Sequence, residues 1–273
     1  FCLAAKGILI HFNIHPQVSL FAINDVMGTI NDRMDSNAEI IFGTTSDSTL
    51  EKDEVKITPI SHATAVISFD NERIYLDPTG GASAFSEFEK PTYVLITDIH
   101  GDHFDTKTLN ELDLSSTTII SPKAVADKFQ NSKAKEIIVI NNDEQKSFKN
   151  FSVEAIPMYN LREEALKFHT KGRGNGYVLT INKERIYFSG DTEDIPEMRN
   201  LKNIDKAFVC MNLPYTMTVE NAANAVLEFK PKEVYPYHYR GTGGLSDVEK
   251  FKQIVTEKNN AIKVVQLDWY PKN

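Results

Sequence analysis

The chain has 273 residues, of which 41% are hydrophobic and 25% are charged, so it can bury a large core. Its formal charge of −8 argues against a nucleic-acid partner, because proteins that bind nucleic acids usually carry a basic surface. The two cysteines, Cys2 and Cys210, exclude a disulfide framework and a CxxC zinc site, and Cys210 ends an apolar run that predicts a buried side chain.

The first 54 residues differ in composition from the rest of the chain. Their opening apolar stretch is interrupted by polar residues and by Pro16, so it is too broken to span a membrane, and it lacks the charged start of a complete signal peptide. We therefore expect a soluble protein and favour the cytoplasm over export. Residues 35–54 are polar and predict a linker or loose arm. We assign 1–54 to an N-terminal extension or linker and 55–273 to a compact domain.

From residue 55 onward, short runs of β-branched and aromatic residues predict strands, and amphipathic stretches predict helices. The predicted strands are 55–60, 64–69, 73–78, 93–97, 117–121, 136–141, 147–157, 176–181, 185–191, 233–237 and 262–267. The predicted helices are 106–112, 122–129, 218–229 and 246–257. Strands come early in each half and helices follow, which indicates an α/β domain.

One internal repeat is visible in this domain. AVISFDNERIYLDPT at 65–79 matches YVLTINKERIYFSGD at 177–191. Two hairpins with similar turn chemistry could share this pattern by chance, whereas a duplicated sheet-plus-helix unit would give two sheets face to face with helices outside. We favour duplication because each copy ends in an acidic loop, at Asp77 and Asp191.

The run YVLITDIHGDHFD, at 93–105, places Asp98, His100, Asp102 and His103 directly after a predicted strand. Two ionised carboxylates in a cleft repel each other, and one would take up a proton. A divalent cation removes that repulsion, because carboxylates and neutral imidazoles are both good metal ligands. A solvated loop is the alternative, but α/β folds place their sites directly beyond buried strands, so we favour a metal site.

Three further polar residues lie next to predicted strands. His169 precedes the loop KGRGNG, Asp191 follows RIYFSG, and His238 ends EVYPYH. A single residue of this kind is most often structural. Together, however, they indicate one rim of the sheets, where they would join the cluster at 98–103.

The motifs ITDIHGDHFD, GNGYVL, IYFSGDT and PYHYRG resemble those of the metallo-β-lactamase superfamily. Within it, they are similar to the branch of L-ascorbate-6-phosphate lactonase and related metal-dependent hydrolases. The resemblance covers residue 55 to the C-terminus and leaves 1–54 outside. It implies a four-layer αββα sandwich of two mixed sheets, with helices outside and two metal ions at one edge of the sheets.

The family signature is usually His-x-His-x-Asp-His, and this chain has Asp98 at its first position. The resemblance implies that metal one is held by Asp98, His100 and His169, that metal two is held by Asp102, His103 and His238, and that Asp191 bridges them. Asn160 is the fallback ligand if His169 is not used. The diiron oxidoreductases of the superfamily typically have Glu where His100 stands, so this imidazole favours hydrolysis.

The substitution at Asp98 changes the expected charge of the metal cluster. With three carboxylates and a hydroxide, two dications are balanced, whereas the usual His would leave a charge of +1. Harder oxygen donors favour Mn²⁺ or Fe²⁺ more than an all-nitrogen site does, although zinc remains our first choice. Alternatively, metal one binds weakly and only one site is filled.

The resemblance implies that a hydroxide bridging two divalent metals is the nucleophile, because a dication can lower the pKa of bound water to roughly 7. Asp102 and Asp191 are the predicted catalytic residues: the first orients the hydroxide and shuttles its proton, and the second bridges the metals. The predicted substrate-binding residues are His62, Arg173, Tyr215, Tyr239 and Arg240. His62 could instead support a ligand, the tyrosines could simply pack, and Lys171 is more often a solvated surface residue.

The sequence therefore predicts a dinuclear metal-dependent hydrolase acting on a small, possibly anionic ester, lactone or phosphodiester. A nuclease-type phosphodiesterase remains an alternative, although the acidic balance disfavours it. A non-catalytic metal-binding protein of the same fold is the other alternative, and the complete set of seven ligands disfavours it. We do not infer β-lactam hydrolysis, because this fold supports many chemistries.

Overall fold

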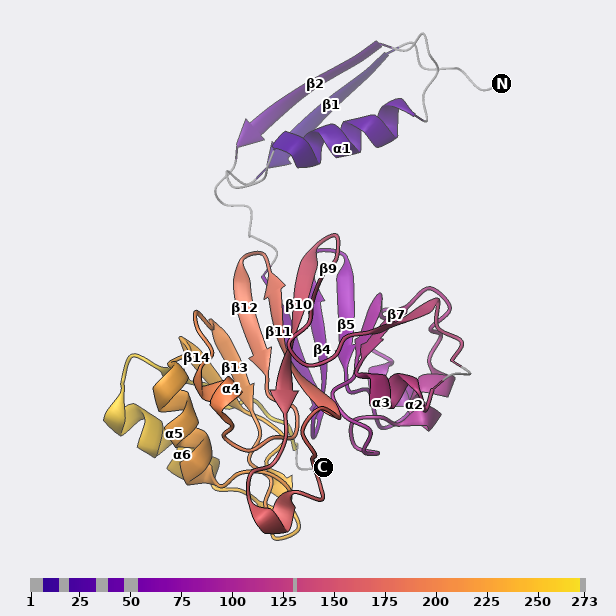
Figure 1. Ribbon diagram of the computed structural model, residues 1–273. Helices are drawn as coiled ribbons and strands as arrows, with labels where there is room; N and C mark the ends of the chain where they lie inside the picture. Colours follow the sequence, from indigo (N-terminus) through magenta and orange to yellow (C-terminus); the bar gives the residue numbers. More distant parts are fainter. Residues whose placement is uncertain (1–6, 15–19, 33–38, 47–53, 130–131, 271–273) are drawn as a thin grey trace. The chain divides into compact units, whose positions relative to one another are not determined.

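The computed structural model describes residues 7–14, 20–32, 39–46, 54–129 and 132–270. The chain divides into two compact units, residues 1–54 and residues 55–273 (Figure 1). The division falls where the composition of the sequence changes.

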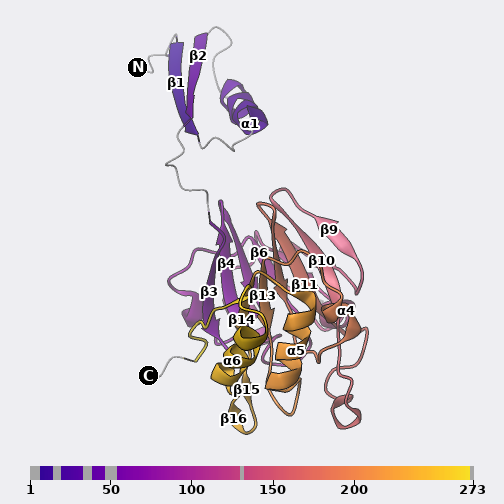
Figure 2. The same ribbon diagram turned by 90° about the vertical axis from the view of Figure 1, so that its left-hand side faces the viewer.

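The N-terminal unit is a βαβ element. Strand β1 (Gly7–Ile14) pairs in parallel with β2 (Glu39–Ser46), and helix α1 (Leu20–Asn31) lies between them along the chain. Two parallel strands need such a crossover, because a tight turn can join only antiparallel neighbours. Ile23 and Met27 are buried and lie one helical turn apart, so both face the same way. Figure 2 shows the helix along one side of the two strands.

Among residues 35–54, whose polar composition predicts a linker or loose arm, those at 39–46 instead form a strand. Within them, β2 pairs along its whole length with β1, from Glu39 opposite Gly7 to Ser46 opposite Ile14. The run EIIF supplies the β-branched and aromatic residues that favour a strand, and the pairing satisfies its backbone. Residues 35–38 and 47–53 lie outside the described residues.

In the second unit, one sheet has the strand order β3-β4-β5-β6-β7-β8. Its strands are β3 (Lys56–Ser61), β4 (Thr64–Phe69), β5 (Glu72–Leu76), β6 (Tyr93–Leu95), β7 (Thr118–Ser121) and β8 (Glu136–Val139). Strands β3 to β5 pair antiparallel, and β5 to β8 pair in parallel. The predicted strand 93–97 ends at Leu95, because Thr97 leaves the sheet and donates two hydrogen bonds to Asp77.

The other sheet has the order β17-β14-β13-β12-β11-β10-β9. Its strands are β9 (Gln145–Ser147), β10 (Phe151–Met158), β11 (Gly174–Ile181), β12 (Glu184–Phe188), β13 (Lys206–Val209), β14 (Glu233–Pro236) and β17 (Lys263–Val264). A turn divides the predicted strand 147–157 into β9 and β10, and the predicted strand 262–267 is reduced to β17. Strands β15 (Arg240–Gly241) and β16 (Gly244–Leu245) form a separate small hairpin.

The two sheets repeat one pairing order. The antiparallel hairpin β4–β5 is followed by the parallel strands β6, β7 and β8, and the antiparallel hairpin β11–β12 is followed by the parallel strands β13, β14 and β17. The two hairpins contain the repeated sequences at 65–79 and 177–191, and their turns contain Asp70 and Asn182 at positive φ. This shared topology supports a duplicated unit.

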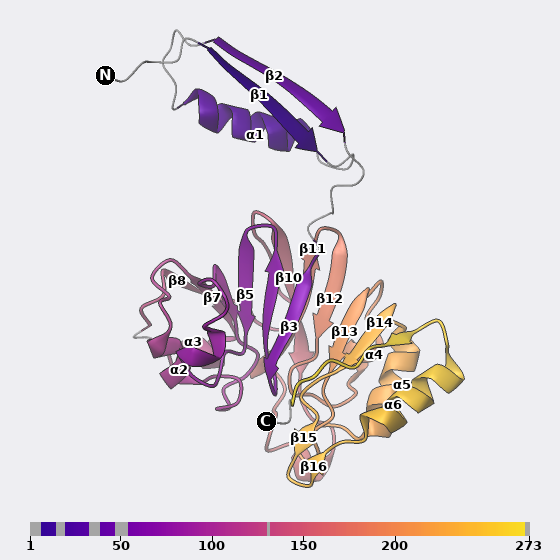
Figure 3. The same cartoon turned by 180° about the vertical axis from the view of Figure 1, so that it is seen from behind.

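Helices cover the outer faces of the sheets. They are α2 (Thr106–Glu111), α3 (Lys123–Ala126), α4 (Pro196–Arg199), α5 (Val219–Phe229) and α6 (Val248–Lys258). Figure 3 shows α2 and α3 beside the sheet that contains β7, and α5 and α6 beside the sheet that contains β14. This arrangement is the predicted α/β sandwich of two mixed sheets. Within the described ranges, no helix has the length and apolar character needed to cross a membrane.

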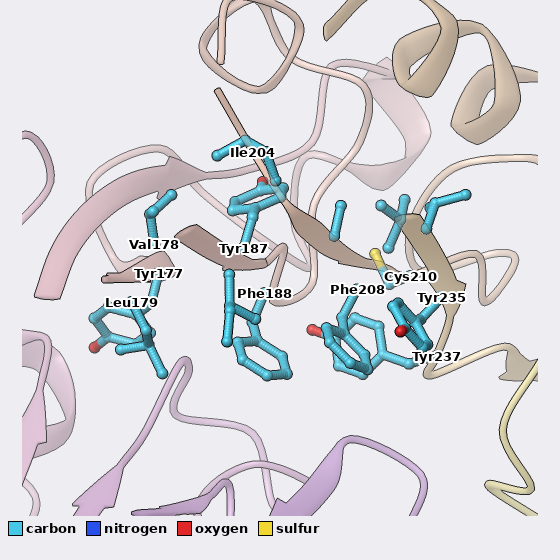
Figure 4. Close-up of a cluster of buried hydrophobic side chains, with 14 of the residues drawn as sticks. Tyr177, Val178, Leu179, Tyr187, Phe188, Ile204, Phe208, Cys210, Tyr235 and Tyr237 are labelled. Carbon is cyan, nitrogen blue, oxygen red and sulfur yellow. The ribbon is translucent and has the colours of Figure 1, made fainter. Parts of the chain in front are cut away.

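The main core fills the space between the sheets and fixes where their strands end. Phe188 and Phe208 stack with ring centroids 4.6 Å apart. Figure 4 shows these rings and Tyr237 pointing toward the first sheet, whereas Tyr187 points to the opposite face, as expected for alternating strand residues. Burying each such ring contributes about 1.5–3 kcal/mol. Cys210 is fully buried in this cluster, which confirms the prediction for its side chain.

Candidate metal centre

The candidate site is built from loops that follow strand ends. The loop after β6 carries Asp98, His100, Asp102 and His103, and the loops after β12 and β14 carry Asp191 and His238. Because the carboxyl ends of parallel strands meet at the same edge of a sheet, their loops converge there. His169 comes from the loop between β10 and β11.

The structure brings all seven predicted ligands together, in two groups. Within each group, the possible ligand atoms lie within 4.8 Å of one another; one group is Asp98, His100 and His169, and the other is Asp102, His103, Asp191 and His238. Five of these side chains are buried, and His100 and Asp102 are partly exposed. Apart from Asp191, which the resemblance assigns to both metals and which clusters here with the second group, these are the sets that the resemblance implies for metals one and two.

Asp191 contacts both groups. Its Oδ2 lies 3.2 Å from His169 Nε2 and 3.5 Å from His103 Nε2, and its Oδ1 lies 3.0 Å from His238 Nε2. A carboxylate in this position can give one oxygen to each of two cations. This is the residue that the resemblance implies as the bridge between two metals.

The donor atoms of the second group fit a divalent cation. His103 Nε2 and His238 Nε2 lie 3.1 Å apart in the interior, and Asp102 Oδ2 lies 3.5 Å from His238 Nε2. Such a set of imidazole nitrogens and carboxylate oxygens is the ligand chemistry of Zn²⁺, Mn²⁺ and Fe²⁺. Without a cation, the two ring nitrogens and the carboxylates can be satisfied only by protons.

The pKa values of the second group show that its buried carboxylates require positive charge nearby. Burial would raise the pKa of Asp191, but the imidazoles of His238 and His103 outweigh it and hold that pKa well below its usual range. Burial would lower the pKa of His103, but the charges of Asp191 and Asp77 raise it well above its usual value. The pKa of His238 is also raised, by Asp191 and Asp102 against the effect of burial. A cation would replace these protons.

Asp77 is a site residue to which the sequence prediction gave no role in the site. Its Oδ2 lies 2.7 Å from His103 Nδ1, and its carboxylate also accepts hydrogen bonds from the backbone N–H and hydroxyl of Thr97. These contacts fix the imidazole with Nε2 toward the centre, as supporting carboxylates do at many metal sites. The available signal was that each copy of the repeat ends in an acidic loop, at Asp77 in one copy and at Asp191 in the other.

Arg173 lies against Asp98, which is fully buried. Its Nε donates to Asp98 Oδ1 at 3.1 Å, and its second guanidinium nitrogen donates to Oδ2 at 3.0 Å. Burial would raise the pKa of Asp98, but the hydrogen bond from His100 and the charges around the carboxylate, Arg173 among them, lower it. In the two-metal arrangement that the resemblance implies, this guanidinium would add back the positive charge that the Asp98 carboxylate cancels, a contribution that the expected neutral cluster leaves out.

The glycines of GRGNG allow this approach. A Cβ on Gly174 would lie 2.9 Å from the carbonyl oxygen of Thr97 and 3.1 Å from Asp98 Oδ1, which is closer than side chains normally pack. The loop that carries Arg173 can therefore reach Asp98 only because this position has no side chain. Arg173, predicted as a substrate contact, thus pairs with Asp98, a predicted metal ligand.

The other predicted substrate contacts lie in two places. His62 Nε2 lies 3.4 Å from Asp102 Oδ2, and its Nδ1 lies 2.7 Å from the hydroxyl of Tyr270. Tyr239 and Arg240 pack on the ring of Tyr270, with the guanidinium carbon 4.2 Å from its centroid. All three side chains therefore contact Tyr270, and His62 also lies beside the centre.

A cavity of about 360 Å³ opens onto the centre. It is lined by the predicted ligands His100, Asp102, His169 and Asp191 and by Phe168, Asn212 and Tyr215. Tyr215 was predicted from the sequence, whereas Phe168 and Asn212 were not. The fallback ligand Asn160 donates its amide to the carbonyl oxygens of Ala165 and Tyr215, so this amide holds loops together.

Comparison with known proteins agrees with this geometry. Residues 72–239 match the model of the Beta-lactamase superfamily domain, and residues 2–65 match that of the FtsZ family C-terminal domain. UPF0173 metal-dependent hydrolases of Pyrococcus abyssi and Pyrococcus furiosus are 27% and 28% identical over 221 residues, which are 76% of this chain and 95% of each relative.

Solved structures show the same relationship. A protein assigned as a metal-dependent hydrolase from Parabacteroides distasonis is 37% identical, with a TM-score of 0.71 over 79% of this chain and 94% of that one. A metallo hydrolase of Ignicoccus hospitalis shares the fold, with a TM-score of 0.65, 22% identity, and coverage of 78% of this chain and 94% of that one. These matches do not single out the lactonase branch. The chain belongs to the metallo-β-lactamase superfamily and is a metal-dependent hydrolase of that superfamily.

Proposed function

We propose that this hydrolase uses two divalent metal ions to activate water against a small ester, lactone or phosphodiester. The observation that supports this proposal is the convergence of the seven predicted ligands in two groups, with the Asp191 carboxylate in contact with both. A carboxylate in that position suits a pair of cations better than a single one.

The bound metals would supply hydroxide at neutral pH and would polarise the oxygen of the substrate. Zinc is our first choice, with manganese or iron as alternatives, because the donor set is mixed imidazole and carboxylate. With Asp98 as a ligand, each metal would have one carboxylate of its own, two imidazoles and the shared Asp191, so the choice of metal is equally open at both positions.

The residues around the centre have separable roles in this proposal. Asp77 orients the imidazole of His103, and Arg173 fixes the carboxylate of Asp98. Asp102 is 41% exposed in its side chain and lies at the mouth of the site, where it would orient the attacking water and accept its proton. His62 contacts this carboxylate and would position it.

The test is metal analysis followed by hydrolysis assays on the same preparations. Protein that is dialysed and reloaded should hold two equivalents of divalent metal and hydrolyse generic p-nitrophenyl esters or bis-p-nitrophenyl phosphate. Asp191→Asn and His103→Ala should abolish turnover and leave the far-ultraviolet circular dichroism unchanged. Two equivalents of metal without turnover of any substrate in a broad panel would instead favour a non-catalytic metal-binding protein.

A further inference from the structure

We propose that the substrate is an uncharged carboxylic ester, open-chain or cyclic, that carries an apolar group, and that Asn212 binds its carbonyl oxygen. This inference rests on the proposed hydrolytic function and names the substrate class. In the reaction, the oxygen of water bonds to the carbonyl carbon, the bond to the alkoxy oxygen breaks, and the departing oxygen takes a proton. The products are an alcohol and a carboxylate, with the remaining proton released.

Part of the cavity wall is aromatic. The rings of Phe168 and Tyr215 meet edge to face, with centroids 5.1 Å apart, and both side chains line the cavity. The two loops that carry them also expose Leu161, Leu166 and Leu213. Such a concentration of apolar side chains around an opening is typical of a surface that receives an apolar ligand group.

This wall is held in place before any substrate binds. Arg162 donates to the carbonyl oxygens of Pro214 and Thr216, at 2.9 Å and 2.8 Å, and its Nε contacts Glu193 at 2.6 Å. The guanidinium thereby ties the loop after β10 to the loop after β13, and Glu193 is itself buried. A preformed wall lowers the ordering cost of binding.

Asn212 presents a fixed hydrogen-bond donor to the same cavity. The hydroxyl of Thr216 accepts from the backbone N–H of Asn212 at 3.0 Å and donates to its Oδ1, so the amide oxygen is turned away from the site. Its Nδ2 lies 3.4 Å from His238 Nε2, and the side chain is buried. Once His238 binds a cation, this amide is left to donate to an oxygen of the substrate.

Lysine and arginine side chains do not line the described walls of the cavity, and three of the nearby basic residues pair with carboxylates. Arg173 pairs with Asp98, Lys171 with Glu197 at 2.7 Å, and Arg162 with Glu193. Lys167 is exposed, with its ammonium 5.1 Å from the centroid of the Phe168 ring. An anionic substrate would normally be met by a guanidinium or ammonium group, so the lining favours a neutral one.

The experiment compares two esters that differ in charge but have the same leaving group and similar acyl length. With fully metallated protein, kcat/KM for p-nitrophenyl butyrate should exceed that for p-nitrophenyl hemisuccinate and for bis-p-nitrophenyl phosphate by at least about tenfold, which corresponds to 1.4 kcal/mol.

Phe168→Ala and Tyr215→Ala should each raise KM for the butyrate about tenfold at unchanged metal content. Asn212→Ala should lower kcat by about 10²- to 10³-fold with little change in KM. Val139→Ala, an exposed apolar residue on β8, is the matched control and should behave as the unmodified protein.

The outcomes separate the two proposals. Faster hydrolysis of the hemisuccinate or of the phosphodiester would overturn the substrate class and leave the hydrolase standing, and a loss of that activity in Lys167→Met would identify the cation responsible. Equal effects of Phe168→Ala and Val139→Ala on the butyrate would overturn the aromatic wall. No hydrolysis of these three compounds or of any other substrate in the broad panel, by protein with two equivalents of metal, would contradict the proposed function itself.

Discussion

Arg173 and Asp98 form a two-point ion pair inside the protein, with Nε to Oδ1 at 3.1 Å and a terminal nitrogen to Oδ2 at 3.0 Å. Together they carry no net charge, as a neutral imidazole would at the same place. The chain therefore combines a carboxylate at the first position of the signature with the overall charge of the usual imidazole. The guanidinium that offsets the charge of Asp98 comes from the loop before β11.

The first prediction concerns Arg173→Met. Removing the guanidinium takes one charged partner from the buried Asp98 carboxylate and leaves it in contact with His100 Nδ1 at 2.6 Å, so the cost in the metal-free protein is at most about 3–5 kcal/mol. The melting temperature of the metal-free protein should fall by roughly 2–4 °C per kcal/mol. A divalent cation then meets an unopposed carboxylate, so the rise in melting temperature on adding Zn²⁺ should be larger than in the unmodified protein.

Arg185→Met is the control for this measurement, because Arg185 pairs with Glu154 at 2.9 Å on a partly exposed part of the second sheet. It should leave the metal-induced shift unchanged. A smaller shift in Arg173→Met than in the unmodified protein would contradict this prediction. It would mean that the guanidinium favours metal binding, by holding the Asp98 carboxylate in place, more than its positive charge disfavours metal binding.

The second prediction concerns Asp77→Asn. This change removes the negative charge that holds His103 Nδ1 at 2.7 Å, and the loss of such a supporting carboxylate typically costs 10- to 100-fold in metal affinity, on the order of 1.4–2.7 kcal/mol. Competition with a chelator of known affinity would measure it. Asp70→Asn, in the turn between β4 and β5, is the control, since asparagine also tolerates the positive φ of that position. Equal metal affinity in the two variants would exclude the role assigned to Asp77.

The third prediction is that the stability of the metal-free protein falls as the pH rises, whereas its affinity for metal increases. The folded-state pKa values of His103 and His238 are raised above about 6.5, the value of an unperturbed histidine. Their contribution to stability is fully present below that pH and is lost as the pH rises through the folded values. A cation displaces these same protons, so metal affinity should increase with pH.

Calorimetric titration with Zn²⁺ in two buffers of different ionisation enthalpy would measure the protons released on binding. Release should be close to its maximum wherever the pH lies below the raised pKa values, because the metal-free protein still holds these protons there, and it should fall as the pH rises through those values. Metal binding without proton release in this range would show that the two imidazoles are already neutral in the metal-free protein.

The fourth prediction separates His62 from the ligands. Its Nε2 lies 3.4 Å from Asp102 Oδ2, and burial lowers its pKa, so the neutral ring is favoured near pH 7. His62→Gln should lower kcat by about 10- to 100-fold, because Asp102 loses a group that fixes its carboxylate, while two equivalents of metal remain bound. Tyr270→Phe removes the hydroxyl that holds His62 Nδ1 and should give a smaller decrease in the same direction. Loss of one metal equivalent in His62→Gln would instead make this residue part of the metal site.

The sequence by itself determined the fold class and the superfamily. Alternating apolar strands, the repeated hairpin and the HGDH run are local patterns, and local patterns survive in any arrangement of the chain. The residue types that can bind metal were also visible, since each lies next to a strand whose apolar side chains must be buried.

The tertiary structure alone decided which of these atoms face one another. Arg173 and Asp98 are far apart in the chain, and nothing in the local sequence of either shows that a glycine-lined loop brings them together. The support of His103 by Asp77 and the orientation of Asn212 by Thr216 likewise depend on how β5, β6 and β13 end at one edge. Side-chain pairing across loops is set by the packing of the two sheets, because the core fixes the strand ends and the strand ends fix the loops.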